Sequence, residues 1–290
     1  MSSRGSLACV GAGMMLGAHI GARGRATIEQ ADVVFVLVAD ALFEGWIARM
    51  NRDVRSLQPY YGHGRLRSDS YERMVEAMLA EVRAGRKVCG VFYGHPGVFA
   101  LVPHAAIARA RAEGHRASME PGVSAEDCLY ADLGIDPGTV GCQHYEASQF
   151  MFCERVVDPA AWLVLWQVGI AGDRSLARFE TGARHRALLV DKLLRTYPAD
   201  HRVVLYEAST LPTETFRNDG VRLADLAGAE VGMATTLVIP PATRLKADAE
   251  MIRRVRMLEA ALAASPAADC HGMPVAAGTA ARSQVGMEQA

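Results

Sequence analysis

Three tyrosines and two arginines gather in one short glycine-containing stretch, at Tyr60, Tyr61, Arg65, Arg67 and Tyr71. A tyrosine hydroxyl donates a hydrogen bond or, once deprotonated, acts as a base, and an arginine guanidinium stabilises negative charge that develops on an oxygen. These residue types can therefore serve a reaction that moves a proton. The residues alone favour a simpler interpretation, in which Tyr71 belongs to the apolar core and Arg67 is a solvated loop residue.

A glycine turn, Gly11-Ala12-Gly13, follows the first apolar run of the chain. Glycine lets the backbone turn tightly and approach a ligand closely. The dinucleotide-binding pattern G-x-G-x-x-G would need glycine at position 16, where Leu16 stands, and Asp40 after the second apolar run is a candidate ribose-binding acid. A turn that serves only the chain topology explains these glycines equally well.

A second loop, Tyr93–Ala100 with the sequence Y-G-H-P-G-V-F-A, lies between an apolar run and a helical pattern. Ligands of α/β sheets bind beyond the carboxyl ends of the strands, where this loop is expected. Its glycines and proline leave backbone groups open to a small polar ligand, and Val98 and Phe99 can form a wall for an adenine ring. We therefore interpret this loop as functional.

A third loop, Glu120–Glu126 with the sequence E-P-G-V-S-A-E, precedes a predicted helix that ends before Gly134. Ser124 is the expected N-cap, and the free N–H groups of such a helix start can bind a ligand. An ordinary capping box explains the same residues.

The elements that position these residues follow from the hydrophobic pattern. Short β-branched runs predict buried strands, and apolar residues three and four apart predict helices. In the first part of the chain we expect strands at Leu7–Val10, Val33–Val38 and Lys87–Tyr93, a helix at 71–82 capped by Ser68 or Asp69, and a helix at 100–113. This alternation predicts an α/β fold, in which a parallel or mixed sheet has helices on both faces.

The pattern changes near residue 118. Beyond the capped helix we expect strands at Trp162–Val168, Arg202–Tyr206 and Thr235–Ile239, a helix at 185–197 and an amphipathic helix at 246–264. We therefore divide the chain into an N-terminal α/β domain (1–117), a C-terminal α+β domain (118–243) and a final segment (244–290). The polar, aperiodic tail of that segment is expected to be disordered.

The composition argues against several classes of protein. A net charge of −1 gives no excess for binding nucleic acid, and the six cysteines form no C-x-x-C pair of a zinc site or disulfide framework. The N-terminus does not resemble a signal peptide, and no apolar run reaches the length of a membrane span. We expect a cytoplasmic protein with no metal and no nucleic-acid or membrane partner.

The three loops, together with Ala234-Thr235-Thr236 before a predicted strand, resemble the S-adenosylmethionine (SAM) dependent tetrapyrrole methylase superfamily over roughly residues 5–241. The resemblance implies two α/β domains with SAM in the cleft between them. In that superfamily the first loop continues with Pro-Gly-Asp and serves a porphyrin-like substrate. Here Met14-Met15-Leu16 stand in its place, which argues against a tetrapyrrole substrate.

A narrower resemblance, to the borosin peptide α-N-methyltransferases, covers nearly the full chain before the tail. It is carried by Y-G-H-P-G-V-F-A, by E-A-S-Q-F-M at 146–151, by L-W-Q at 165–167 and by the spacing of Tyr61, Arg67 and Tyr71. It implies that these three residues act at a peptide backbone amide and that SAM leaves as S-adenosylhomocysteine. With the loop residues above, the expected cofactor-binding residues are Tyr93, His95, Val98, Phe99, Ala100, Ser124, Ala125, Gln167, Ala208, Thr235 and Thr236.

The resemblance also implies a mechanism and partners. Tyr71 or Tyr61 would take the amide proton, and Arg67 would stabilise the charge on the carbonyl oxygen and lower the pKa of the tyrosine. The tail holds no Val/Ile-rich segment like the precursor peptides fused to some family members. We therefore expect a separate precursor peptide (the split arrangement), bound to a homodimer or to a heterotetramer with two precursor chains.

Other functions are compatible with the same cofactor loops. One is a SAM-dependent C-methyltransferase of a tetrapyrrole or corrin, and another is a ribose or tRNA methyltransferase of this fold. A third is a non-catalytic module that only binds SAM, and the most distant is a dinucleotide-dependent oxidoreductase.

Overall fold

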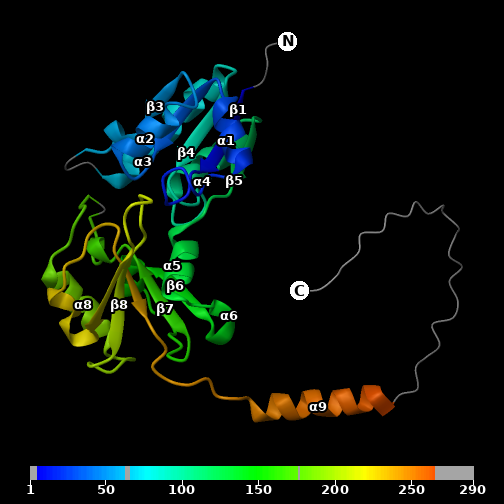
Figure 1. Cartoon of the computed structure of the whole chain (residues 1–290), viewed down its shortest axis with the longest axis vertical. Coiled ribbons are helices and arrows are strands. Elements are labelled where there is room, and N and C mark those ends of the chain that lie inside the picture. The colour runs from blue at the N-terminus through cyan, green and yellow to red at the C-terminus, as the bar shows by residue number, and fades with distance from the viewer. Residues whose placement is uncertain (1–4, 63–65, 176, 265–290) are drawn as a thin grey trace, which may run out of the picture. The chain divides into compact units, whose positions relative to one another are not determined.

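The computed structural model describes residues 5–62, 66–175 and 177–264 (Figure 1). The predictions for Arg65 and for the tail after residue 264 lie outside these residues. The chain divides into two compact units, with the boundary between Leu245 and Lys246. The expected division at 117/118 falls inside the first unit and stays a prediction.

The first sheet of the larger unit is fully parallel, with the strand order β3-β2-β4-β1-β5. Its strands are β1 (Ser6–Gly11), β2 (Val33–Leu37), β3 (Val54–Ser56), β4 (Lys87–Phe92) and β5 (Arg116–Glu120). The crossovers that parallel strands require contain α1 (Ala22–Glu29), α2 (Ala41–Ile47), α3 (Arg67–Arg83) and α4 (Leu101–Ala112). The predictions of β1, β2 and β4 are confirmed, whereas β3 and β5 were not predicted.

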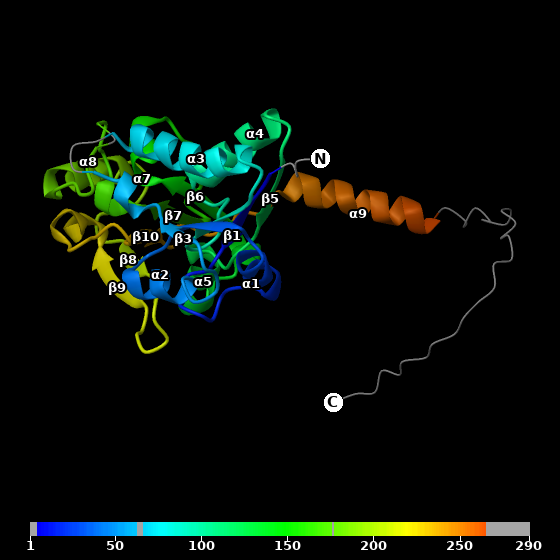
Figure 2. The same cartoon turned by 90° about the horizontal axis from the view of Figure 1, so that it is seen from above.

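Helices cover both faces of this sheet. Figure 2 shows α3 and α4 on one side and α1 and α2 on the other. Leu7 and Cys9 of β1 pack with the first pair, and Val10 packs with the second, as alternation along a strand requires. Every residue of β2 is buried, which is the pattern of a strand covered on both faces. The predicted α/β arrangement is therefore confirmed.

Helix α3 carries two of the predicted catalytic residues, Arg67 in its first position and Tyr71 one turn later. Its predicted apolar face is buried at Met74, Val75, Met78, Leu79 and Val82. The predicted N-cap is wrong. Leu66 precedes the helix in an extended conformation without a side-chain cap, and Ser68 and Asp69 lie within the first turn.

The second sheet has the strand order β6-β7-β10-β8-β9 and is mixed, since β6 and β7 are parallel and the remaining neighbours antiparallel. Its strands are β6 (Cys142–Glu146), β7 (Trp162–Trp166), β8 (Arg202–Glu207), β9 (Arg217–Arg222) and β10 (Thr236–Ile239). The accompanying helices are α5 (Ala125–Leu133), α6 (Pro137–Val140), α7 (Ala147–Phe152) and α8 (Ala183–Leu193).

The faces of the second sheet are also covered by helices. Leu129 of α5 packs against Val164 and Val238 on one face, and Phe150 of α7 and Leu189 of α8 pack on the other. Three strands and α8 were predicted here with boundaries that differ slightly, and Val168 lies in a short 3-10 helix, Val168–Ile170, instead of in β7. Strands β6 and β9 were not predicted.

The smaller unit contains α9 (Ala249–Ala264), which confirms the helix predicted in this region. Its apolar residues Met251, Ile252, Val255, Leu258 and Leu262 are exposed. No helix within the described residues is long and apolar enough to cross a membrane.

Candidate active site

Three glycine-containing loops meet at one edge of the first sheet. They follow β1, β4 and β5, whose carboxyl ends share that edge because the strands are parallel. Gly94 N donates to Gly13 O at 2.9 Å, and Gly13 N donates to Gly94 O at 3.2 Å. A Cβ on Gly11 would lie 2.6 Å from Gly94 O, and one on Gly122 would lie 2.7 Å from Gly11 Cα. The three backbones approach so closely that only glycine fits at Gly11 and Gly122.

The loop after β4 is braced by its own polar groups. Gly97 N donates to His95 Nδ1 at 2.9 Å, and His104 Nε2 of α4 lies 3.0 Å from Gly97 O. The ring of His95 is therefore oriented by the backbone of its own loop. Among the predicted neighbours, Val98 is half-buried and Ala100 occupies the N-cap position of α4.

Phe99 and Gln167 are the two non-glycine residues with positive φ in the part of the chain that the structure describes, at 48° and 58°. Such conformations cost a residue on the order of 1–3 kcal/mol and are concentrated at ligand sites. The ring of Phe99 lies 5.6 Å from that of Trp166, the residue before Gln167. The structure thus brings together two residues that were predicted from separate motifs to bind the cofactor.

Trp166 is fixed by a chain of hydrogen bonds that the sequence did not reveal. Trp166 Nε1 donates to His144 Nδ1 at 3.1 Å, and Tyr130 Oη lies 2.8 Å from His144 Nε2 and 3.0 Å from Glu126 Oε1. Burial lowers the pKa of His144, although the charge of Glu126 acts in the opposite direction. A neutral imidazole therefore accepts the indole N–H and holds the Trp166 ring in place.

The other predicted residues of the second sheet surround the same cluster. Ala125 and Ala208 pack against the apolar group that contains Trp166. Thr235 and Thr236 are buried. Thr235 Oγ1 donates to Glu207 Oε1, and Thr235 O accepts from Val168 N at 3.2 Å. Thr235 therefore lies beside the residue that follows Gln167.

Two polar candidates serve as helix caps. Ser124 Oγ accepts from Asp127 N at 3.2 Å and donates to Asp127 Oδ2 at 2.7 Å, and its helix ends at Gly134 with a φ of 64°. This confirms the predicted cap of α5, and a cofactor contact of Ser124 stays a prediction. Asp40, the candidate ribose-binding acid, accepts from Phe43 N at 2.9 Å and caps α2.

The predicted catalytic tyrosines lie together. The ring of Tyr61 makes edge contacts with Tyr71 at 6.2 Å and Phe179 at 6.1 Å, and Tyr61 and Tyr71 also pack against the core of the first sheet. Tyr71 is therefore partly a core residue, as its position on the apolar face indicated, and also part of a tyrosine cluster.

The pKa of Tyr61 is raised well above its usual value. Burial is the largest cause, followed by the neighbouring hydroxyls of Tyr71 and Tyr93, and the lowering effect of Arg67 is smaller. Burial of its hydroxyl, followed by Tyr71, also raises the pKa of Tyr93, although about half of that residue's surface is exposed, at 49%. Arg67 lowers the pKa of Tyr61, as expected, but burial and the neighbouring tyrosines outweigh this effect, and Tyr61 stays protonated at neutral pH.

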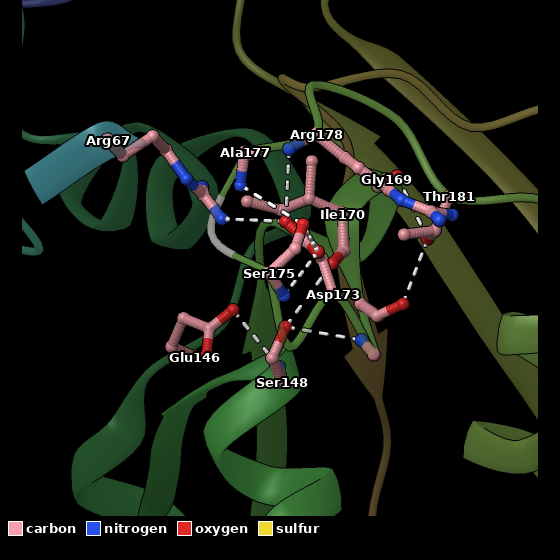
Figure 3. Close-up of polar contacts among 12 residues, drawn as sticks. Arg67, Glu146, Ser148, Gly169, Ile170, Asp173, Ser175, Ala177, Arg178 and Thr181 are labelled. Atoms are coloured by element: carbon pink, nitrogen blue, oxygen red, sulfur yellow. Dashed lines mark hydrogen bonds and ion pairs between the residues drawn. The ribbon is translucent and has the colours of Figure 1, made fainter. Parts of the chain in front are cut away.

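Arg67 reaches across to the second half of the chain, where its Nη2 lies 3.4 Å from Asp173 Oδ2 (Figure 3). Only 16% of the Arg67 side chain is exposed, so its interpretation as a solvated loop residue is wrong. Asp173 was not predicted as a site residue. It lies 106 residues from Arg67 in an irregular loop, and its only local signal is the turn-forming composition of Gly172-Asp173-Arg174-Ser175.

No group of three or more His, Cys, Asp or Glu residues within the described ranges is arranged to hold a metal ion. The polar groups that the structure brings together are instead the tyrosine hydroxyls, the Arg67 guanidinium and the Asp173 carboxylate.

Comparisons with known proteins identify the family and the fold. Residues 6–225 match the family model described as Tetrapyrrole (Corrin/Porphyrin) Methylases. The uroporphyrin-III C-methyltransferase of Thermus thermophilus aligns with a TM-score of 0.56 and 23% identity over 82% of this chain and 95% of that chain. At this identity the likeness concerns the fold alone.

Two curated relatives are more similar in sequence. The methyltransferase/ribosomally synthesized cyclic peptide gymnopeptides precursor of Gymnopus fusipes is 41% identical over 260 residues, 88% of this chain and 62% of that protein. The methyltransferase/ribosomally synthesized type I borosin cyclic peptide precursor of Coprinopsis marcescibilis is 48% identical over 212 residues, 72% of this chain and 54% of that protein. The chain thus spans less than two thirds of the length of these relatives.

Proposed function

This chain belongs to the tetrapyrrole (corrin/porphyrin) methylase family, and on that premise we propose that it is a SAM-dependent methyltransferase that acts on backbone amide nitrogens of a peptide. The observation that carries the proposal is the assembly of Tyr61, Tyr71 and Arg67 beside Tyr93 of the loop after β4. The relatives described above are named as methyltransferases joined to precursors of cyclic peptides, which supports a peptide as the substrate.

We propose that SAM binds where the loops of the first sheet meet β7 of the second. The strained Phe99 and Gln167 and the Phe99–Trp166 ring contact suit an aromatic base, and the glycine loops offer backbone groups to its polar parts. When bound, SAM supplies an electrophilic methyl group on a positively charged sulfur and leaves as S-adenosylhomocysteine. The residues proposed to hold it are Tyr93, His95, Val98, Phe99, Ala100, Ser124, Ala125, Gln167, Ala208, Thr235 and Thr236.

The tyrosine and arginine side chains answer the chemical difficulty of this reaction. An amide nitrogen is a poor nucleophile because its lone pair is delocalised into the carbonyl group. The N–H proton must leave as the nitrogen forms its bond to the methyl carbon. In our proposal Tyr71, in its deprotonated phenolate form, takes this proton directly or through a water molecule, and the Arg67 guanidinium stabilises the negative charge that gathers on the carbonyl oxygen.

Tyr61 has a different role in this scheme. Because burial and two neighbouring hydroxyls raise its pKa, Tyr61 keeps its proton and serves as a hydrogen-bond donor. Tyr61 also contacts Tyr71 directly through its ring, so it positions Tyr71. The base is therefore assigned to Tyr71.

We further propose that the peptide is a separate chain and that the enzyme is a homodimer, or a heterotetramer with two precursor chains. Within the 290 residues no Val/Ile-rich segment follows β10. The cysteines of the described residues, which are Cys9, Cys89, Cys128, Cys142 and Cys153, are unpaired, which supports a reducing compartment such as the cytoplasm.

Intact-mass spectrometry tests the proposed function. The protein is coexpressed with short open reading frames encoded beside its gene, and Arg67→Ala is coexpressed in parallel as the control with an impaired site. Mass gains in steps of one methyl, localised to backbone nitrogens and much smaller with the control, support the proposal. If no peptide gains mass while the purified protein carries SAM, the tetrapyrrole C-methyltransferase and the non-catalytic SAM-binding module become the better hypotheses. Methyl transfer to a tetrapyrrole then separates those two.

A further inference from the structure

We propose that Asp173 is the positioning residue for Arg67, so that the second half of the chain sets the place of the cation that serves the peptide carbonyl. This inference rests on the proposed function and adds a residue that the loop motifs do not contain. It depends on three features of the structure, which are the burial of Asp173, the hydrogen bonds that hold its loop and the geometry of Arg67.

Asp173 is an enclosed carboxylate with many donors. It is 3% exposed, and it accepts hydrogen bonds from Ser175 Oγ at 2.6 Å, Ser175 N at 2.9 Å and Arg178 N at 3.2 Å (Figure 3). Burial raises the pKa of Asp173, but these donors and the charge of Arg67 outweigh it and bring the pKa below the usual value. Asp173 is therefore ionised, and it is a poor base because its oxygens are already occupied.

The loop around Asp173 is braced on both sides. On one side, Ser148 Oγ donates to Ile170 O at 3.2 Å and accepts from Gly172 N at 3.2 Å (Figure 3). On the other, buried Thr181 Oγ1 lies 2.9 Å from Ala171 O and 3.2 Å from Gly169 O, and its single proton is shared between these carbonyls. Side chains far apart in sequence therefore hold the residues that lead into Asp173 by hydrogen bonds.

These hydrogen bonds explain the motif E-A-S-Q-F-M, which lies outside the loops proposed to bind the cofactor. Glu146 accepts from Ser148 N at 3.0 Å and from Gln149 N, which starts α7 at a fixed point. Ser148 is thereby aimed at Ile170 and Gly172. The motif thus acts on Arg67 at a distance, through the loop that carries Asp173.

Arg67 itself needs such a partner. Its long side chain begins at the first residue of α3, where no side-chain cap fixes the helix start. A carboxylate at 3.4 Å with 2% side-chain exposure holds the guanidinium more strongly than a surface ion pair would, because water screens it less. In the proposed reaction the guanidinium fork also donates to the developing oxyanion.

The test compares Asp173→Asn, Asp173→Ala, Arg67→Ala and the double variant Arg67→Ala/Asp173→Ala with the wild-type protein, using the peptide found by coexpression. Asp53→Asn is the matched control. Asp53 also pairs with an arginine, Arg55 at 2.8 Å, but it precedes β3 at the opposite edge of the sheet from the loops. The measurements are kcat and KM for the peptide and the Kd of SAM by calorimetry.

We expect Asp173→Asn to lower kcat by about 100-fold, with KM and the Kd of SAM changed less than about threefold, because a misplaced guanidinium mainly affects the transition state. In the Arg67→Ala background the Asp173→Ala change should cause no further loss, whereas Asp53→Asn stays at the wild-type rate. Independent, multiplying losses of Arg67→Ala and Asp173→Ala would overturn the proposal, since they indicate a general structural role. An Asp173→Asn enzyme that keeps more than half of the wild-type kcat would also overturn the proposal.

A second measurement does not depend on turnover. The Arg67 Nε–Hε signal in an NMR spectrum, assigned by its loss in Arg67→Lys, should shift in Asp173→Asn and stay unchanged in Asp53→Asn. If it stays unchanged in Asp173→Asn, the positioning role is wrong even where no methylated peptide is found. If it shifts while no peptide is methylated, the pair is real and the proposed peptide substrate is what fails.

Discussion

The two sheets of the larger unit hold their candidate site residues by different means. On the first sheet, close contacts between backbone segments hold these residues. Gly11 and Gly122 lie against each other with no room for a Cβ, Gly13 and Gly94 exchange hydrogen bonds, and Phe99 is held at a positive φ.

On the second sheet, side chains hold other side chains. Trp166 is fixed by His144, Asp173 is enclosed by Ser175, and Thr235 Oγ1 is engaged by Glu207.

The two regions are therefore sensitive to different substitutions. A site made of closely packed backbone tolerates exchange of its side chains but no added carbon at its glycines. A site made of buried side-chain pairs tolerates small backbone shifts but loses its geometry when one partner is removed.

The largest effect is expected where the two regions meet, at the tyrosine cluster. Tyr71→Phe should lower kcat by about 10²–10⁴-fold, because it removes the proposed base, whereas Tyr61→Phe should cost about tenfold. Steady-state methylation of the identified peptide measures both, and circular dichroism checks that each variant is folded. A Tyr61→Phe enzyme that is slower than Tyr71→Phe would reverse our assignment of the base.

The next effect tests the backbone of the first sheet. Gly122→Ala should lower the free energy of unfolding by about 3 kcal/mol, because its Cβ would meet the backbone of Gly11, which no rotamer change relieves. Gly45→Ala is the control, since Gly45 lies inside α2 with nothing within 4 Å of its added Cβ. This substitution should raise the free energy of unfolding by up to about 1 kcal/mol. Urea unfolding followed by fluorescence measures both. Equal changes would show that the glycine approach is not limiting.

A smaller effect is expected for the side-chain contacts of the second sheet. Thr235→Val keeps the shape of the residue but leaves Gly232 N and Glu207 without their hydroxyl partner, which should cost about 2 kcal/mol. Thr27→Val removes an exposed hydroxyl on α1 that donates to Arg23 O and should change the stability by less than about 0.5 kcal/mol. The two unfolding curves show whether the loss of stability depends on the burial of the removed hydroxyl. Equal losses in both variants would show that burial has no effect.

The smallest effect concerns pH. Because burial lowers the pKa of His144 below its ordinary value of about 6.5, protons bind the unfolded chain more readily than the folded one at this residue. The contribution of neutral His144 to the free energy of unfolding is therefore complete above about pH 6.5 and is lost as the pH falls below that value. Wild-type protein should lose more stability than His144→Gln between pH 7.5 and pH 5. A larger loss in the variant would mean that the charge of Glu126 outweighs burial.

The predictability of the fold varied from strand to strand. Strand β2, V-V-F-V-L, could be predicted because a strand covered on both faces is apolar throughout. Strand β9, R-N-D-G-V-R, contains residues that disfavour strands and stays largely exposed at the sheet edge, so the sequence pattern did not predict it. The N-cap of α3 was misplaced because an extended Leu66, and not a capping side chain, precedes that helix.

The candidate site divides in the same way. The loops after β1, β4 and β5 could be assigned to one place, because parallel strands bring their carboxyl ends to one edge whatever the side chains are. Asp173 could not be found, since nothing in a short turn sequence tells which residue 106 positions away it will meet.

Features that depend on neighbours along the chain could be predicted from the residues alone. They include the apolar periods of α3 and β2, the cap and end of α5 at Ser124 and Gly134, and the glycines that turn the loops. Only the tertiary structure decided what depends on burial and on distant partners. It took Arg67 out of solvent and paired it with Asp173, and it raised the pKa of Tyr61 by enclosing it beside Tyr71. Charge and protonation respond to the dielectric surroundings of a group, and those surroundings exist only once the chain has folded.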